Sequence, residues 1–234
     1  RSNDSYTPGG VAGKRPDRAV LVYAQRCREA FKGVPVIIGG IEASLRRIAH
    51  YDYWSDKVKR SVLPDSKADL LVFGNGERQL LEIAKRLADG ESVKALTDIR
   101  GTAFMRKEVP AGWVEMDSTE LDKPGPLIVH PDPYAMQEGC EQAPATEPNQ
   151  PIELAVKTAQ KMWGNRDRTV IRLPDYEEVA KDPVLYAHAS RLMHLETNPG
   201  NARALVQRHG ARDVWLNPPP IPLTTPEIDA VFDL

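Results

Sequence analysis

Asp69-Leu-Leu-Val-Phe-Gly-Asn-Gly76 decides the fold class of this chain, together with an earlier stretch of similar pattern, Val34-Pro-Val-Ile-Ile-Gly-Gly40. Each contains a short, continuously apolar run of the kind found in buried parallel strands, and glycines end each run. The residues that follow predict helices over 77–88 and 42–49. With another helix expected over 17–31, the alternation predicts an α/β fold with a parallel sheet flanked by helices.

Two of the predicted helices have an apolar face that we expect to be buried. On the helix over 17–31, which Asp17 would cap, this face comprises Ala19, Val20, Tyr23, Cys27, Ala30 and Phe31. On the helix over 77–88 it comprises Leu80, Leu81, Ile83, Ala84 and Leu87. Cys27 is therefore predicted to be a buried and unreactive thiol.

The pattern loosens after residue 101. We predict a hairpin from strands over 102–106 and 113–116, and then a proline-rich excursion over 117–151. Further elements are expected after it: helix 152–163, strand 169–173, helices 175–182, 184–196 and 200–209, strand 213–216 and a helix from Pro226. The chain is thus divided into an N-terminal domain (1–108), a hairpin and linker (109–151) and an α/β connecting region (152–234).

Composition limits the classes of function. The chain has 234 residues, two cysteines, 20 prolines, and 31 basic against 33 acidic side chains. A net charge of −2 excludes a whole-surface nucleic-acid binder but leaves a local patch open. Two distant cysteines provide neither a disulfide framework nor a CxxC metal site. No apolar run approaches the ~18 residues of a membrane helix, and no signal peptide opens the sequence, so we expect a cytoplasmic protein.

The two glycine turns, Gly39-Gly40 and Gly74-Asn75-Gly76, each follow a predicted buried strand. Ligands of open α/β sheets bind outside the carboxyl ends of strands, where glycine allows close approach to the backbone. Residues 74–79 lack the third glycine of the dinucleotide fingerprint, because Gln79 stands there. The alternative is that these glycines only make tight strand-to-helix turns.

The stretch over 46–60 interleaves cations with aromatic rings. Its cations are Arg46, Arg47, Lys57, Lys59 and Arg60, and its rings are His50, Tyr51, Tyr53 and Trp54. Such a pattern suits single-stranded nucleic acid or a nucleotide, so we single out Arg46, Arg47, His50, Tyr53 and Trp54 as candidate substrate or nucleic-acid contacts. The alternative is an interface, in which the rings are buried and the arginines pair with carboxylates.

Other catalytic patterns are missing from the sequence. His188 and His194 do not have the i, i+3 or i, i+4 spacing of a metal pair on a helix, and Glu196 and His209 complete no HExxH motif. GxSxG and Walker A motifs are also absent. The residues taken alone therefore indicate neither a metal site nor an enzyme.

Longer blocks of this sequence closely resemble the YgiQ family of bacterial radical S-adenosylmethionine (radical SAM) proteins. These blocks are Lys14–Ala19, Val36–Arg47, His50–Trp54, Asp69–Glu77, Leu185–Ser190 and His194–Gly200. In that family such a segment precedes a radical SAM barrel, whose CxxxCxxC motif this sequence lacks. The resemblance implies a piece of a longer protein: an N-terminal domain that covers the barrel and helps to recognise substrate or cofactor. The [4Fe–4S] cluster and S-adenosylmethionine would belong to the full-length protein only.

Two shorter blocks are similar to strand-end turns of cobalamin-binding-type domains, which implies a partial Rossmann-like sheet. The matching residues, and hence the candidate cofactor contacts, are Gly39, Gly40, Ala43 and Ser44 in the first turn and Gly74, Gly76 and Glu77 in the second. Glu42 and Asn75 replace the usual His and Glu, which counts against cobalamin itself. A nucleic-acid-binding module, for example for tRNA, that uses the stretch over 46–60 remains the alternative function.

Overall fold

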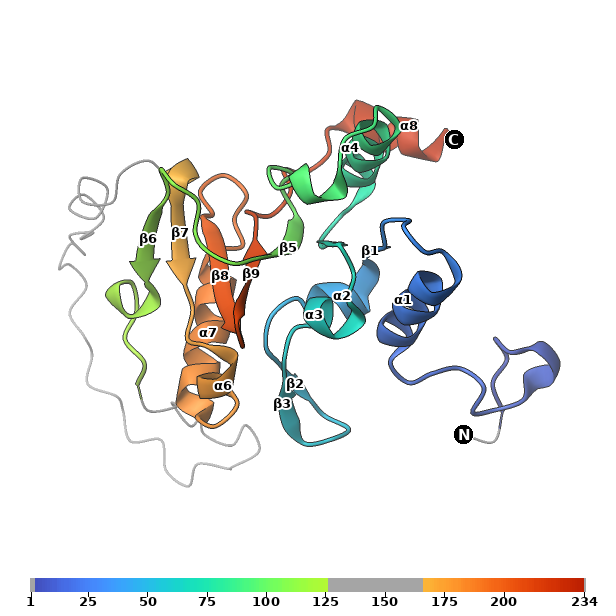
Figure 1. The fold of residues 1–234 in the computed structure, drawn as a ribbon, viewed down its shortest axis with the longest axis horizontal. Coiled ribbons are helices and arrows are strands. Elements are labelled where there is room, and N and C mark those ends of the chain that lie inside the picture. The colour runs from blue at the N-terminus through green and yellow to red at the C-terminus, as the bar shows by residue number, and fades with distance from the viewer. Residues whose placement is uncertain (1–2, 126–165, 234) are drawn as a thin grey trace, which may run out of the picture.

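A computed structural model describes residues 3–125 and 166–233 of the chain (Figure 1). The predicted helix over 152–163 and most of the proline-rich excursion lie outside the described residues. None of the helices in the described part is long and apolar enough to cross a membrane.

A seven-stranded mixed sheet forms the centre of the fold, in the order β1-β4-β5-β9-β8-β7-β6. Its strands are β1 (Ile37–Ile38), β4 (Leu70–Val72), β5 (Thr102–Arg106), β9 (Arg212–Leu216), β8 (Ala204–His209), β7 (Thr169–Arg172) and β6 (Val114–Asp117). β1 pairs in parallel with β4, and β6, β7 and β8 form a second parallel group. The strands between them pair antiparallel, so the prediction of an α/β sheet is confirmed but its parallel pairing holds only at the two ends.

The predicted hairpin of 102–106 with 113–116 is wrong. β5 lies between β4 and β9, whereas β6 pairs with β7 at the far edge of the sheet. The connecting segment crosses one face of the sheet instead of turning back beside β5. Trp113 on this segment makes an edge-to-face contact with Trp215 of β9, at 4.8 Å between ring centroids. The packing of the half-buried Trp113 on the buried Trp215 outweighs the local turn signal at Pro110–Gly112.

The predicted helix over 200–209 is also wrong, because most of this segment forms β8. β8 makes a hairpin with β9, in which His209 is paired with Arg212. Gly210 in the connecting turn has φ +64°, a conformation that tight hairpin turns require and glycine supplies at low cost. The strand pairing is therefore decided by contacts across the turn rather than by the helix propensity of the segment itself.

The remaining described elements are helices and one small sheet. The helices are α1 (Ala19–Ala30), α2 (Gly40–Leu45), α3 (Val62–Ser66), α4 (Glu77–Ala88), α6 (Tyr176–Val179), α7 (Pro183–Leu195) and α8 (Thr225–Phe232). α4 has the predicted bounds, and α7 nearly so. α2 ends earlier than predicted, because His50 begins an antiparallel pair of strands, β2 (His50–Asp52) with β3 (Lys57–Lys59). α1 begins at Ala19 after Arg18 and has no side-chain cap, so the prediction that Asp17 caps it is wrong.

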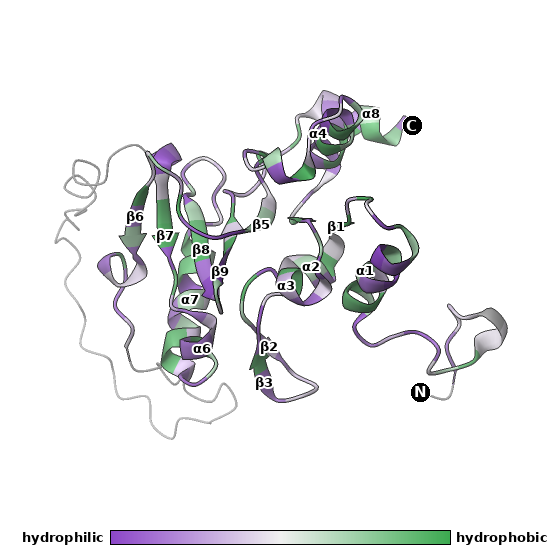
Figure 2. Ribbon diagram, viewed as in Figure 1, coloured by the Kyte–Doolittle hydropathy of each residue, from purple (hydrophilic) through white to green (hydrophobic). Residues whose placement is uncertain are grey.

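Apolar side chains form a layer on each face of the sheet, as the alternation along β4 illustrates. Leu71 belongs to a cluster that contains Ala24 of α1 and Leu192 of α7. Leu70 belongs to the opposite cluster, with Ile83 of α4. Figure 2 shows the apolar residues concentrated along the strands and on one side of the helices. Period-2 alternation of this kind fixes which face each strand residue occupies.

The two apolar helix faces are largely exposed, contrary to prediction. On α1 Ala24 is buried, whereas Tyr23, Phe31 and Cys27 are exposed. α1 packs against α3 and β1 through Ala24 and the partly buried Val20, and Tyr23, Cys27 and Phe31 remain outside this contact. On α4 Ile83 is buried, but Leu80 is 52% and Leu81 66% exposed. An amphipathic helix whose apolar face is only partly covered marks a surface that another body can bury.

Candidate functional site

The two glycine turns meet at one edge of the sheet. β1 and β4 are parallel neighbours, with Ile38 beside Leu71 in the register, so their carboxyl ends point the same way. Gly39 and Gly40 follow β1, and Gly74 follows β4 after Phe73. The structure thus places the predicted turns side by side, at the edge where open α/β sheets bind ligands.

A pocket of about 270 Å³ opens at this edge, beside the carboxyl ends of β4 and β9 and the end of α7. It is lined by Ser44, Arg47, Phe73, Gly74, Met193, Glu196, Thr197, Arg203, Leu205, Leu216, Asn217, Pro219 and Pro220. Ser44 and Gly74 are predicted cofactor contacts and Arg47 is a predicted substrate contact. We call this the strand-end pocket.

The other predicted cofactor contacts do not line the strand-end pocket. Ala43 is fully buried in the apolar core. Gly39, Gly40 and Glu77 are exposed at the turns, and Gly76 is half-buried. Only part of each predicted motif therefore reaches the pocket, and the assignment of these residues as cofactor contacts stays a prediction.

The conformation of Gly74 is explained by contact within the chain. It has φ +75°, and a Cβ atom added there would lie 3.2 Å from Cγ of Pro220. Gly40 has φ +80° with no atom within 4 Å of an added Cβ. Both turns need a left-handed backbone that glycine adopts readily. Gly74 in addition leaves room for residues 218–222, four of which are prolines and which we call the proline-rich segment.

Arg47 is the unbalanced charge of the strand-end pocket. Its guanidinium lies over the Phe73 ring, 5.0 Å from the centroid, and its Nη1 donates to the backbone carbonyl of Ser44. Its Nε is buried and has no hydrogen-bond acceptor. Among the described residues no carboxylate forms an ion pair with Arg47. Burial lowers the pKa of the Arg47 guanidinium, because the charged form loses water and gains no nearby carboxylate in return.

The remaining polar residues of the pocket compensate one another. Arg203 donates through Nε and Nη2 to Glu196, and the backbone N–H of Arg203 donates to the same carboxylate at 2.6 Å. Both side chains of this ion pair are nearly buried, at 11% and 6% exposure. The side-chain amide of Asn217 accepts from Trp215 and donates to the carbonyls of Thr97 and Ile99. The net charge of the pocket is therefore that of Arg47.

The basic and aromatic stretch over 46–60 does not form a single patch. Arg46 pairs with Glu42 at 2.7 Å, and Arg60 pairs with Asp65. Arg47 lies in the strand-end pocket. The hairpin of β2 and β3 retains Lys57 and Lys59, which form no ion pair with described residues. The five cations predicted for one surface are thus divided between carboxylate partners, the pocket and the hairpin.

The tip of the same hairpin exposes two rings. Tyr53 is 78% and Trp54 77% exposed, and they contact each other edge-to-face at 5.9 Å between centroids. His50, at the start of β2, is half-buried with Nδ1 3.3 Å from the carbonyl of Ile48, and burial lowers its pKa. Arg18 holds the buried Asp52. The rings are therefore available to a partner, whereas most neighbouring charges are already paired.

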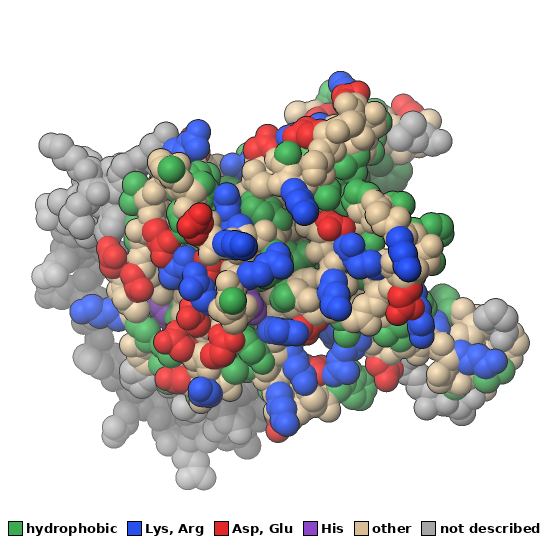
Figure 3. All heavy atoms as spheres, viewed as in Figure 1, with side chains coloured by type: hydrophobic (Ala, Val, Ile, Leu, Met, Phe, Trp, Pro, Cys, Tyr) green, Lys and Arg blue, Asp and Glu red, His purple; other side chains and the backbone are tan. Residues whose placement is uncertain are grey.

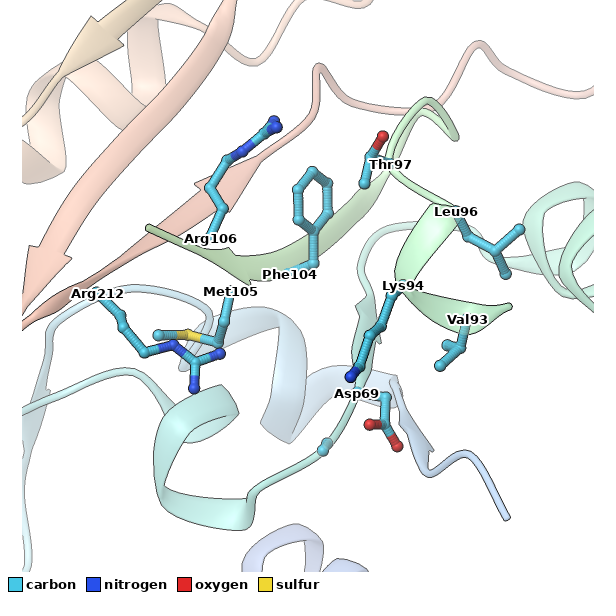
Figure 4. A pocket seen from close by; sticks show the side chains of 10 residues that line it. Asp69, Val93, Lys94, Leu96, Thr97, Phe104, Met105, Arg106 and Arg212 are labelled. Atoms are coloured by element: carbon cyan, nitrogen blue, oxygen red, sulfur yellow. The ribbon is translucent and has the colours of Figure 1, made fainter. Parts of the chain in front are cut away.

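Sequence patterns gave no sign of a second pocket, of about 290 Å³, near the amino ends of β4 and β9. Figure 3 shows Lys and Arg side chains gathered over the middle of the face on which Figure 1 places β5 and β9. Lys94, Arg106 and Arg212 are among the residues that line the pocket. In Figure 4, however, Arg106 and Arg212 lie on opposite sides of β5. The cations therefore do not converge on one point.

Metal-binding groups are not assembled in the described part of the chain. No group of three or more His, Cys, Asp or Glu side chains there could hold a metal ion. Cys27 is exposed on α1, and Cys140 lies outside the described residues. His209 is buried in the core region with neither ring nitrogen hydrogen-bonded. Two cysteines in the whole sequence are also too few for a site with three thiolate ligands.

Comparison with known proteins identifies relatives over the whole chain. The family described as Radical SAM N-terminal matches residues 1–234. A UPF0313 protein of Pseudomonas aeruginosa is 58% identical over 239 residues, and the UPF0313 proteins YgiQ of Salmonella typhimurium and Escherichia coli K12 are 57% identical over 234 residues. These matches cover 100% of this chain and 32% of each relative. No solved structure matches the chain significantly. The chain belongs to the Radical SAM N-terminal family, as represented in UPF0313 (YgiQ) proteins.

Proposed function

We propose that this domain packs against the radical SAM part of a longer protein, covers the barrel and contributes to recognition of substrate or cofactor. The observation that carries the proposal is a set of exposed apolar side chains on α4, on α8 and in the segment that precedes α8. We call it the α4–α8 surface, and it comprises Leu80, Leu81, Ile221, Ile228, Val231 and Phe232. Phe232 is 85% exposed, which is an unfavourable position for a phenylalanine in a domain that stands alone.

The α4–α8 surface has the properties of an interface. Arg78 of α4 pairs with Glu227 of α8 at 2.7 Å, which holds the two helices together (Figure 1). Several large apolar side chains exposed on two neighbouring helices are typical of a surface that contacts another protein. The chain spans about a third of the length of the relatives it matches, so a large partner is available within the same polypeptide.

The reaction chemistry belongs to that partner. A radical SAM [4Fe–4S] cluster needs three cysteine thiolates, and this chain has two cysteines far apart in sequence. The residues of the chain therefore do not fit the cluster. In the longer protein the cluster and S-adenosylmethionine would be held by the barrel, and this domain would supply contacts from the strand-end pocket and the α4–α8 surface.

Hydrogen exchange tests the docking directly. Peptides from α4 and α8 should exchange more slowly in the full-length protein than in the 234-residue chain, because docking protects their amides. Leu81→Glu in the full-length protein should restore fast exchange, while Lys85→Glu, an exposed polar position on the same helix, should not. Equal exchange of α4 and α8 in the two proteins would contradict the proposed docking.

Anaerobic reconstitution tests the enzymatic part. We expect the full-length protein to acquire the charge-transfer absorbance of a [4Fe–4S] cluster and to cleave S-adenosylmethionine. We expect the 234-residue chain to acquire no stoichiometric cluster. A full-length protein without either property would show that the parent is not a radical SAM enzyme.

Nucleic-acid binding through the β2–β3 hairpin is the second candidate, and the exposed rings of Tyr53 and Trp54 favour it. Within the described residues only Lys57 and Lys59 of this hairpin form no ion pair, so binding of single-stranded RNA should depend weakly on salt. We expect a slope of about −1.4 in the plot of log affinity against log salt, since each phosphate contact contributes about −0.7. Trp54→Ala should weaken such binding, and an RNA affinity that this change leaves intact would remove the hairpin from consideration.

A further inference from the structure

The strand-end pocket contains one cationic side chain whose hydrogen bonds are incomplete. Arg47 uses Nη1 on the carbonyl of Ser44, while its buried Nε has no acceptor. Its Nη2 likewise makes no hydrogen bond to a described residue. Buried donors are nearly always satisfied in native proteins, so Arg47, which lines the pocket, keeps donor capacity that no described residue uses.

The arginine is held in position before any ligand binds. The Phe73 ring supports its flat face, and Ser44 anchors one end of the guanidinium. Nε and Nη2 form the side of a guanidinium that can bind both oxygens of a planar oxyanion at once. Fixing this side chain in advance reduces the entropy that binding would otherwise cost.

The surrounding charges favour an anion. Glu196, the carboxylate that lines the pocket, is neutralised by Arg203 and by a backbone N–H. Phe73, Met193, Leu205 and Leu216 make the rest of the lining largely apolar. A cation with few competing dipoles and little water around it attracts an anion more strongly than an exposed one does.

We propose that the strand-end pocket binds a small organic anion, whose carboxylate or phosphate group pairs with the guanidinium of Arg47. A volume of about 270 Å³ has room for a small molecule, but not for a whole corrin ring system. The inference rests on the proposed recognition role of this domain, because it names the ligand class of the pocket that would perform it.

Arginine side-chain NMR of the 15N-labelled 234-residue chain tests the site. Succinate and inorganic phosphate are titrated separately, against sodium chloride at matched ionic strength. We expect a saturable shift of the Arg47 Nε–H resonance with at least one of the two anions, together with shifts of the backbone amides of Phe73 and Gly74. The anion that binds more tightly identifies carboxylate or phosphate as the preferred group.

Variants separate specific binding from general charge effects. Arg47→Gln should weaken binding at least about tenfold, the usual effect of losing a charge-assisted hydrogen bond. Arg47→Lys should also weaken it, because lysine lacks the planar fork. Arg46→Gln is the matched control, since Arg46 is paired with Glu42 outside the pocket, and it should leave binding unchanged.

The site is overturned if neither anion moves the Arg47 resonance, or if Arg47→Gln binds as the wild type does. If the glutamine variant does not fold, the wild-type titration decides alone: a response confined to the pocket supports the site, and one spread over all arginines removes it. A negative titration with protection of α4 intact in the full-length protein would remove the anion site and leave docking. A positive titration without that protection would do the reverse.

Discussion

Nη2 of Arg78 on α4 lies 2.8 and 2.7 Å from the two carboxylate oxygens of Glu227 on α8. Nη1 of the same arginine donates at 2.8 Å to the carbonyl of Ile221. One side chain thus attaches both the proline-rich segment and the C-terminal helix to α4. The hydrogen bond from Arg78, with those from Thr224, lowers the pKa of Glu227 to about 2.

We expect Arg78→Ala to loosen α8 without unfolding the sheet. Amide exchange in 225–232 should accelerate, while exchange in β8 and β9 should stay slow. Lys85→Ala, an exposed position on the same helix, is the control. In the wild type the attachment should weaken as pH falls from about 4.5 towards 2, because protonation of Glu227 removes a bond that is fully present above the ordinary carboxyl pKa. Unchanged exchange of α8 in Arg78→Ala would show that the contact contributes nothing.

Asp213 on β9 should be one of the most sensitive positions for stability. It is fully buried, and Nε of Arg208 lies 2.8 Å and Nη2 of Arg172 3.2 Å from its oxygens. Burial alone would raise the pKa of Asp213, but the hydrogen bonds from both arginines hold it below its usual value. Asp213→Ala leaves Arg208, which is 40% exposed, without a carboxylate and leaves Arg172 with Glu115 alone. Because water screens Arg208 and Glu115 still pairs with Arg172, we expect a loss of about 1.5–3 kcal/mol, the range for hydrogen bonds to a charged group.

Urea unfolding of the Asp213 variant measures this loss. Asp229→Asn, on the exposed surface of α8, should change the free energy of unfolding little. A loss below about 1 kcal/mol in Asp213→Ala, within the range of exposed ion pairs, would mean that the network has little influence on stability.

His209 should make the fold sensitive to mild acid. Burial, and to a lesser extent Arg60, lowers the pKa of this imidazole to about 4. It stacks on Tyr176 at 5.5 Å between ring centroids and remains neutral in the native state near neutral pH. The unfolded chain takes up a proton near pH 6.5 whereas the folded chain does not, so stability falls between about pH 6.5 and 4 by about 3 kcal/mol.

Replacing the ring by one that does not titrate isolates this contribution. His209→Phe should flatten the pH dependence of the free energy of unfolding between pH 6.5 and 4, relative to the wild type. Carboxyl groups titrate in both proteins and cancel in the difference. Parallel curves would assign the acid sensitivity to other groups.

Gly74 and Gly40 provide a comparison between packing and backbone strain. Both have positive φ, for which an L-residue pays about 1–2 kcal/mol. A Cβ at Gly74 would also lie 3.2 Å from Pro220, whereas a Cβ at Gly40 would meet open space. Thermal unfolding should therefore show a larger loss for Gly74→Ala than for Gly40→Ala. A larger loss for Gly40→Ala would indicate that the proline-rich segment moves aside at little cost when a Cβ is added at residue 74.

Cys27 should react in the native protein, since its side chain is exposed on α1. In a Cys140→Ser background we expect one thiol to react with an aromatic disulfide reagent without denaturant. The doubly substituted chain, with Cys27→Ser as well, should not react. If the thiol reacts only after unfolding, Cys27 is buried in the native protein, as the helical pattern predicted.

Local patterns predicted much of the secondary structure. α4, α7, β5, β7 and β9 were found close to the predicted bounds, because caps, glycine breaks and apolar periodicity act within a few residues. The helix predicted at 200–209 failed, because Ala204–His209 is stabilised by its partner β9 and by the Gly210 turn. The exposed face of α4 also escaped prediction, since periodicity reports that a face is apolar and not what covers it.

The sequence by itself determined the α/β class, the two glycine turns and the family, because these depend on short runs of residues read in order. Only the tertiary structure decided that β6 lies at the far edge of the sheet. It likewise decided that the side chain of Arg47 lines a pocket beside Phe73 and does not join the other cations of the basic stretch. It also decided that Glu196 is neutralised by Arg203 rather than left to balance Arg47. Strand order, burial and charge compensation arise from residues far apart in the chain, and no local pattern encodes the distance between them.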